Sequence, residues 1–287
     1  MFSETRATTH KLTAEVVMRP EFVGSLHDDE MARRLGYPAA LVPGIDIYGY
    51  LARSALATWG HAWLERGSLS CTSLRPVYHG DQLVVYAEAM RRHEASSSVD
   101  ISVHNGEGVM IATGAAGLAE TVGATPDLNA WPVVARSKPV PSGAPEDMRE
   151  GLSFSCESEM VSADHNAQLV AEFRDPSRLY LERGIIHPAY LVRVALKNAH
   201  ASFSHATPPI YIGAETQHYS PLRVGERIDV SGRITRLWER KGHHYMESDQ
   251  LIVANGERAI MRVRRTTIYQ ARAASPEEAT STRESRS

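Results

Sequence analysis

Residues 75–85, RPVYHGDQLVV, return later in the chain as residues 220–230, SPLRVGERIDV. The two stretches lie 145 residues apart and align without a gap, so that Gly80 falls on Gly225. Each stretch reads as a glycine-marked turn that opens into a strand of alternating apolar residues. A turn and strand that occur twice at one offset indicate that a larger unit has been duplicated.

The same offset joins the helical patterns of the two halves. Apolar residues recur at helical spacing over 43–65 and over 188–203, and Pro43 falls on Pro188 where these patterns begin. Sequence identity between the halves is low, but one ungapped register connects a helix start, a turn and a strand. We therefore predict an internal duplication of a strand–helix–multistrand unit.

Strand-like runs surround each predicted helix. They cover residues 11–18, 69–74, 82–90, 97–104 and 109–120 in the first half and 152–161, 210–219, 227–237, 244–253 and 258–270 in the second. One long helix with several strands to cover it predicts a helix lying across a curved antiparallel sheet. Two such units would join their sheets and bury the helices, giving an α+β protein.

The composition is that of an ordinary globular protein, with 43% hydrophobic and 23% charged residues. The 31 basic residues against 34 acidic ones give no support to nucleic-acid binding. Only Cys71 and Cys156 are present, so neither a disulfide framework nor a cysteine-based metal cluster is expected. The first residues lack the apolar core of a secretory signal, and the apolar run 109–119 is too short for a membrane helix. These features favour a cytoplasmic protein.

Composition also suggests where the units end. Residues 121–150 hold five of the fifteen prolines and show no apolar periodicity, so we interpret them as an extended linker. The predicted units are then residues 1–120 and 151–272. The polar residues 273–287 are predicted to be a disordered tail.

Five segments resemble the MaoC-like, or hydratase-2, branch of the hotdog superfamily. The run SLHDDEMARRLGYPAALVPGIDIYGYLARSAL (25–56) is similar to the family's hydratase segment, and RPVYHGDQLVV to the strand opening that follows it. In the second half the similar segments are IIHPAYLVRVALKNA (185–199), SPLRVGERIDVSGRI (220–234) and RKGHHYMESDQLIV (240–253).

The resemblance implies a double hotdog, that is, two fused helix-on-antiparallel-sheet units. It also implies a thioester substrate carried by coenzyme A or an acyl carrier protein. The family reaction is hydration of a trans-2-enoyl thioester or the reverse dehydration, with an Asp and a His of the motif D-x-N-P-x-H acting on the water. No cofactor is implied. A fused pair can be complete as a monomer, although such chains often associate, so a homodimer stays open.

Each half carries only part of that motif. In the first half His27 fits the His position, but Phe22 stands at the Asp position. Gly44 keeps the glycine of the family's H-G pair, where a backbone N–H at the helix start would bind the thioester oxygen. His27 can equally be a surface residue ahead of a capped helix.

In the second half the acid is present and the motif histidine is absent. Asp175 stands at the acid position, Ser177 at the Asn position and Tyr180 where the His is expected. His187 comes just before the helix start, and Ala189 corresponds to the glycine there. Each of these residues also has an ordinary structural reading, as a turn, a helix cap or a half-buried aromatic.

Further candidates lie outside the motif. Asp46, in the first turn of the first helix, can replace the missing acid, although a carboxylate there also simply stabilises the helix. Four arginines of the last predicted strand, Arg258, Arg262, Arg264 and Arg265, can meet coenzyme A phosphates or line a solvated strand face, and Arg262 and Arg264 are the candidates for binding. His243 and His244 are adjacent on a strand and point to opposite faces, so no metal site is predicted.

Three functions follow from these residues, in order of preference. The first is a hydro-lyase in which Asp175 acts on water and His187 or Tyr180 donates a proton. The second is a non-catalytic protein that binds acyl thioesters, because the motif is broken in both halves. The third is a hotdog thioesterase that uses Asp46 or Asp175.

Overall fold

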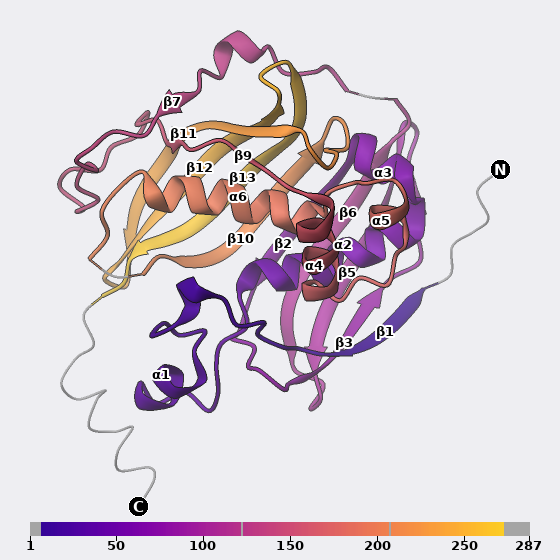
Figure 1. Ribbon diagram of the computed structural model, residues 1–287. Helices are drawn as coiled ribbons and strands as arrows, with labels where there is room; N and C mark the ends of the chain where they lie inside the picture. Colours follow the sequence, from indigo (N-terminus) through magenta and orange to yellow (C-terminus); the bar gives the residue numbers. More distant parts are fainter. Residues whose placement is uncertain (1–6, 122, 207, 273–287) are drawn as a thin grey trace, which may run out of the picture.

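A single curved antiparallel sheet runs through the molecule, and two long helices lie on its inner face (Figure 1). The computed structural model describes residues 7–121, 123–206 and 208–272. In spatial order the main strands are β1 (Thr8–Thr13), β3 (Gln82–Ala87), β5 (Ser96–Asn105), β6 (Met110–Ala119), β2 (Gly67–Ser73), β10 (Ile210–His218), β13 (Arg258–Gln270), β12 (His243–Ala254), β11 (Arg227–Arg240) and β9 (Glu159–Met160), with β4 (Arg91–Arg92) beside β5. The predicted α+β double-hotdog architecture is confirmed.

The two halves meet where β2 pairs with β10. Ser70 pairs directly with Glu215, and these two residues differ by the 145-residue offset found in the sequence. A residue that pairs with its own counterpart lies on a local two-fold axis. The sheet is therefore continuous across the axis, and neither half exposes a strand edge there.

The two glycine turns have the same geometry in both halves. Gly80 has a φ of 92° and Gly225 a φ of 82°, in the left-handed region that glycine adopts without cost. In the first turn the N–H of Tyr78 donates to the Asp81 carboxylate at 2.9 Å. In the second turn the N–H of Arg223 donates to the Glu226 carboxylate at 2.7 Å. The recurring G-D/E pair in the sequence thus encodes one turn made twice.

The first central helix is shorter than predicted. Helix α2 spans Gly44–Trp59 and ends at Gly60, whose φ of 60° breaks the helical path before α3 (His61–Arg66) continues it. The second central helix, α6 (Pro188–Ala201), agrees with the predicted range within two residues.

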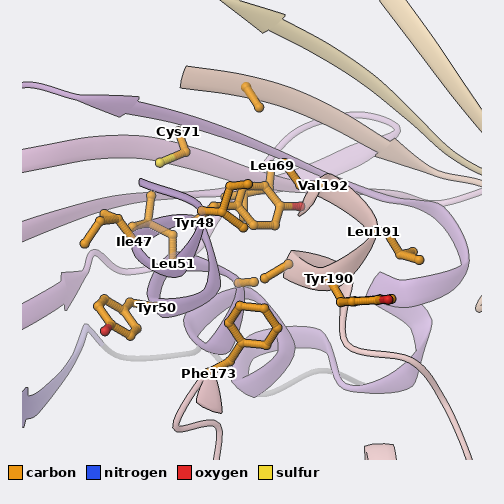
Figure 2. Packing of buried hydrophobic residues seen from close by; sticks show 14 of the residues in the cluster. Ile47, Tyr48, Tyr50, Leu51, Leu69, Cys71, Phe173, Tyr190, Leu191 and Val192 are labelled. Atoms are coloured by element: carbon orange, nitrogen blue, oxygen red, sulfur yellow. The ribbon is translucent and has the colours of Figure 1, made fainter. Parts of the chain in front are cut away.

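Small residues let the two central helices approach closely. A Cβ placed on Gly49 of α2 would lie 3.4 Å from the Ala189 Cβ of α6 and 3.3 Å from the ring of Phe173. Figure 2 shows Tyr48 and Leu51 of α2 on the side facing the strands and Phe173 on the opposite side. The helix pair is therefore buried between the sheet and a loop of the second half.

Several segments of the second half differ from the prediction. Residues 152–161 form only β8 (Ser155–Cys156) and β9, and two unpredicted helices follow, α4 (Ala163–Glu172) and α5 (Leu179–Glu182). In the first half the opening strand lies at 8–13 rather than 11–18. Two short elements, η1 (Pro20–Phe22) and α1 (Asp29–Arg34), follow it.

The proline-rich stretch between the halves is docked on the second half. Within it, η2 (Leu128–Ala130) is followed by β7 (Val134–Ala135), which pairs in parallel with β8. Leu128 and Trp131 pack on an apolar cluster of the sheet's outer face formed by Leu251, Val253 and Ala259. The predicted tail lies outside the described residues. Within the described part of the chain, no helix is long and apolar enough to cross a membrane.

Candidate functional site

Asp175 and His187 meet at the start of α6. The loop after α4 carries the aspartate, and the histidine is the residue just before the helix. His187 Nε2 lies 3.3 Å from Asp175 Oδ2, and both side chains are buried, with exposed fractions of 0% and 2%. The acid of the interrupted motif is thus paired with a histidine that lies outside it in sequence.

A hydrogen bond to the backbone sets the tautomer of His187. Its Nδ1 accepts the N–H of Ala189 at 3.1 Å, so we assign the ring proton to Nε2, which donates to Asp175. His187 therefore caps α6 and orients Asp175 at the same time. The Ala189 N–H, predicted to bind a thioester oxygen, is bonded to this cap.

Asp175 is held as a carboxylate. Burial acts against the charged form, but the hydrogen bond from His187 and the one from the N–H of Ser177, at 2.9 Å, act for it. Together they keep the pKa of Asp175 below its ordinary value. Ser177, which the sequence placed at the Asn position of the motif, thus donates its backbone N–H to the Asp175 carboxylate.

Two aromatic rings enclose the imidazole. Phe173 stacks on His187 at 4.7 Å between ring centres, and Tyr180 packs against it at 4.7 Å. The buried Tyr180 hydroxyl has no hydrogen-bond partner of ordinary geometry among the described residues. Burial, together with the nearby Asp175, raises the Tyr180 pKa well above its usual value, so the hydroxyl stays protonated.

His10 of β1, which the sequence analysis did not single out, lies within electrostatic reach of Asp175. Its buried Nε2 has no partner in the described part of the chain. Burial and then the charge of Arg53 lower the His10 pKa to about 4, and Asp175 opposes this shift. An ion pair between Glu15 and Arg174 also ties the end of the first strand to this loop. Both halves of the chain therefore contribute to the surroundings of Asp175.

His27 lies apart from this pair. Its Nδ1 is 2.6 Å from the carbonyl oxygen of Leu41, and its ring packs on Phe22 at 4.6 Å. Burial lowers its pKa, so the ring is neutral and donates to that carbonyl. Within the described residues no contact joins His27 to Asp175.

The start of α2 differs from that of α6. Pro43 precedes Gly44, and no side chain caps the helix. The Tyr211 ring covers Gly44 so closely that a Cβ there would lie 2.6 Å from the Tyr211 Cδ1. Glycine is therefore required at this position by packing, whatever its N–H binds.

Asp46 belongs to an ion cluster between the two helices. Its Oδ1 lies 3.4 Å from a guanidinium nitrogen of Arg193, which also binds Glu172 at 2.7 Å, and Arg19 lies 3.6 Å from Glu172. Burial raises the Asp46 pKa to about 7, against the effect of Arg193. Because Asp46 and Arg19 belong to the first half and Arg193 and Glu172 to the second, these ion pairs link the two halves.

The two candidate phosphate ligands occupy the outer face of the sheet. Arg262 is paired with Asp249 at 2.8 Å, which neutralises it locally. Arg264 is exposed and lines a shallow groove with Ser70 and Glu215. Neither arginine lies on the inner face with Asp175.

Comparison with solved structures supports the fold. A Chloroflexus aurantiacus protein named as a MaoC domain dehydratase superposes with a TM-score of 0.64 at 13% identity, covering 95% of this chain and 97% of that one. A conserved Mycobacterium tuberculosis protein with a double hotdog fold gives 0.62 at 12% identity, over 92% and 96%. A Lactobacillus plantarum protein named as an oleoyl thioesterase gives 0.52 at 12% identity, over 93% and 96%.

No family model and no curated protein matches the chain. The solved structures share the double-hotdog fold with it, as the resemblance predicted. Because both dehydratases and thioesterases occur among them, the chemistry has to be argued from the residues around Asp175.

Proposed function

We propose that the protein is an acyl-thioester hydro-lyase that adds water to an enoyl thioester or removes it from the 3-hydroxyacyl form. The observation that carries this proposal is the buried pair of Asp175 and His187, with the Tyr180 hydroxyl close to Asp175 and without a hydrogen bond of ordinary geometry among the described residues. An acid and a histidine are the two groups that the D-x-N-P-x-H motif brings to water. Here they come from two different segments.

Asp175 is the base in this scheme. Its pKa is lowered, so it is ionised at neutral pH, and its oxygens retain lone pairs beyond the bonds from His187 and Ser177. In hydration the water oxygen bonds to Cβ of the enoyl group while Asp175 takes a proton from that water. The electron pair of the C=C bond moves to Cα, Asp175 gives it the proton taken from water and becomes a carboxylate again, and dehydration runs through the same steps in reverse.

Tyr180 and His187 have different roles. Tyr180 keeps its proton, so its hydroxyl donates a hydrogen bond to the water or to the thioester oxygen. Both nitrogens of His187 are engaged, one by Ala189 and one by Asp175. His187 is therefore a positioning residue that fixes the aspartate and keeps it charged.

The second candidate is a non-catalytic protein that binds acyl thioesters. It is favoured by the complete burial of His187 and by the use of the Ala189 N–H in the helix cap. In that case the pair would only anchor the start of α6, and thioesters would bind without turnover.

The test uses purified protein and trans-2-enoyl-CoA esters of short, medium and branched chains. Loss of the conjugated enoyl absorbance and release of free thiol are followed in parallel. We expect absorbance loss without thiol, reduced about 10²–10⁴-fold by Asp175→Asn and unchanged by Asp164→Asn, an exposed acid on α4. Thiol release would identify a thioesterase. If neither the absorbance nor the thiol concentration changes although the esters bind measurably, the protein is non-catalytic.

A further inference from the structure

Arg265 is a fully buried cation on the inner face of the sheet. It lies on β13 with an exposed fraction of 1%, and none of its side-chain nitrogens has a hydrogen-bond partner among the described residues. Burial lowers its pKa to about 10, so it remains charged at neutral pH. A buried guanidinium without a counter-ion is costly, and folded proteins rarely keep one without a role.

The residues beside Arg265 in the sheet are small. In the sheet its direct neighbours are Ala214 on β10 and Ser248 on β12. Side chains directly opposite one another in a sheet point to the same face, so these small residues flank the arginine on the inner side. No large side chain from either neighbouring position fills that part of the surface.

Three further polar groups near Arg265 have no hydrogen bond of ordinary geometry among the described residues, although the Tyr211 hydroxyl interacts with the Cys71 thiol. Tyr211 Oη and Thr267 Oγ1 share the inner face with it, and His200 Nε2 approaches from the end of α6. Burial and then the charge of Arg265 keep the pKa of His200 well below its ordinary value, so this ring is neutral. All three groups can donate a hydrogen bond.

The described part of the chain provides no carboxylate to this cluster. The acids of the adjoining strands alternate with the inward-facing residues and therefore lie on the outer face, namely Glu215, Glu247 and Asp249. One buried positive charge surrounded by neutral donors is the arrangement that binds a single negative charge.

A row of polar groups connects Arg265 with the Asp175 site. Thr216 pairs with Val263, two residues from Arg265, which makes Thr216 its diagonal neighbour on the same face. The Tyr48 hydroxyl bonds to Thr216 at 2.8 Å, and Tyr48 also lies within electrostatic reach of Tyr180. The row therefore runs along the inner face from the proposed reaction site to the buried cation.

We propose that Arg265 binds a carboxylate at the far end of the acyl group, so that the substrates are monothioesters of dicarboxylic acids. The proposal rests on the proposed function for the position of the thioester end. A carboxylate matches the planar guanidinium fork and carries one charge, which the arginine neutralises. A phosphate dianion would leave a net negative charge buried in the same place.

Binding of saturated esters tests this proposal apart from catalysis. Isothermal titration calorimetry would compare adipyl-CoA and suberyl-CoA with hexanoyl-CoA and octanoyl-CoA. We expect the protein to bind the dicarboxylic esters at least about tenfold more tightly, and Arg265→Met to remove that preference. The exposed neighbour provides the matched control, and Arg264→Met should leave the preference intact. Equal affinities in the unchanged protein, or a preference that survives Arg265→Met, would overturn the proposal.

Two additional arms keep the result interpretable. If Arg265→Met does not fold, Tyr211→Phe and Thr267→Val each remove one donor with little change of shape, and each should reduce the preference severalfold; no reduction in either counts against the proposal. Pantetheine thioesters of the same acids lack the nucleotide phosphates and should show the same preference. A preference confined to the CoA esters would mean that Arg265 binds phosphate, which also contradicts the proposal.

The outcome does not depend on turnover. Saturated esters have no double bond to hydrate, so a protein without hydro-lyase activity can still show the dicarboxylic preference. Conversely, an active hydro-lyase without the preference would refute only the role of Arg265.

Discussion

The two central helices begin one residue apart in the aligned register and with different side chains at the cap. At α6 a histidine caps the helix and holds Asp175, whereas at α2 the equivalent position is Val42, ahead of an uncapped start at Gly44. The turns and the strand register have kept their geometry in both halves, but the pairing of an acid with a histidine occurs at one helix only. The two halves share the scaffold, and the second half adds the acid–histidine pair on which the proposed chemistry rests.

The largest expected effect comes from making the second helix start like the first. His187→Val installs the residue that the first half carries at Val42 and removes both the cap and the bond to Asp175. We expect enoyl-CoA turnover to fall about 10³-fold. Loss of the cap should also cost about 1 kcal/mol of unfolding free energy.

A milder change tests whether His187 positions the aspartate. His187→Asn can still cap the helix but is too short to hold Asp175. Because the bond from His187 lowers the Asp175 pKa, the acidic limb of the kcat/KM profile should move to higher pH. His27→Ala should leave the profile and the rate unchanged, and loss of turnover in that variant would place the chemistry in the first half.

Asp46 provides a second contrast, since its counterpart on α6 is Leu191. The folded-state pKa of Asp46 is about 7, above the value of about 4 for an unfolded aspartate. The folded protein therefore binds more protons between these values, and its unfolding free energy falls as the pH rises through this window. Asp46→Asn removes the titration and should gain about 4 kcal/mol relative to the unchanged protein between pH 4 and pH 8.

Chemical denaturation at several pH values measures this difference. The exposed Asp164→Asn serves as the control and should show no such trend. A flat difference between the Asn variant and the unchanged protein across the range would mean that Arg193 holds Asp46 fully ionised.

The fold was predictable from the sequence because the duplicated elements are local. A glycine turn, an alternating strand and a proline at a helix start each carry their own signal, and the 145-residue offset repeats all three. The break at Gly60 was missed because a glycine inside a helical pattern does not by itself end a helix. Helices α4 and α5 were missed because their apolar positions are few.

The site was predictable only in part. Asp175, Ser177 and His187 could be selected because they stand near motif positions. The sequence also placed Asp175 and His187 in one site, but the direct bond between them could not be predicted, since it depends on how the loop after α4 folds back on α6. His10 carried no signal, because it is a polar residue on an edge strand. Arg265 was one of four arginines on the last strand with a possible phosphate role, and only the sheet shows that it faces inward, unlike its exposed neighbour Arg264.

Packing at the two helix starts gives a smaller effect. Gly44→Ala would place a Cβ 2.6 Å from the Tyr211 ring, and we expect it to cost about 2 kcal/mol of unfolding free energy. The reverse change at the other helix, Ala189→Gly, creates no clash and should cost about 0.5–1 kcal/mol. Equal costs for the two variants, measured by urea unfolding, would show that Tyr211 moves aside easily.

The smallest effect tests the part of the molecule that duplication left unchanged. Gly80 and Gly225 have positive φ, and a Cβ on either would meet nothing within 4 Å. An alanine there therefore lowers the unfolding free energy through backbone strain alone. Gly80→Ala and Gly225→Ala should each cost about 1 kcal/mol, and the double variant about twice that, because the turns lie in different halves. Thermal or urea unfolding measures all three. If one alanine costs nothing while the other costs several kcal/mol, the two turns are not equivalent, and the halves would differ in their scaffold as well as in the acid–histidine pair of α6.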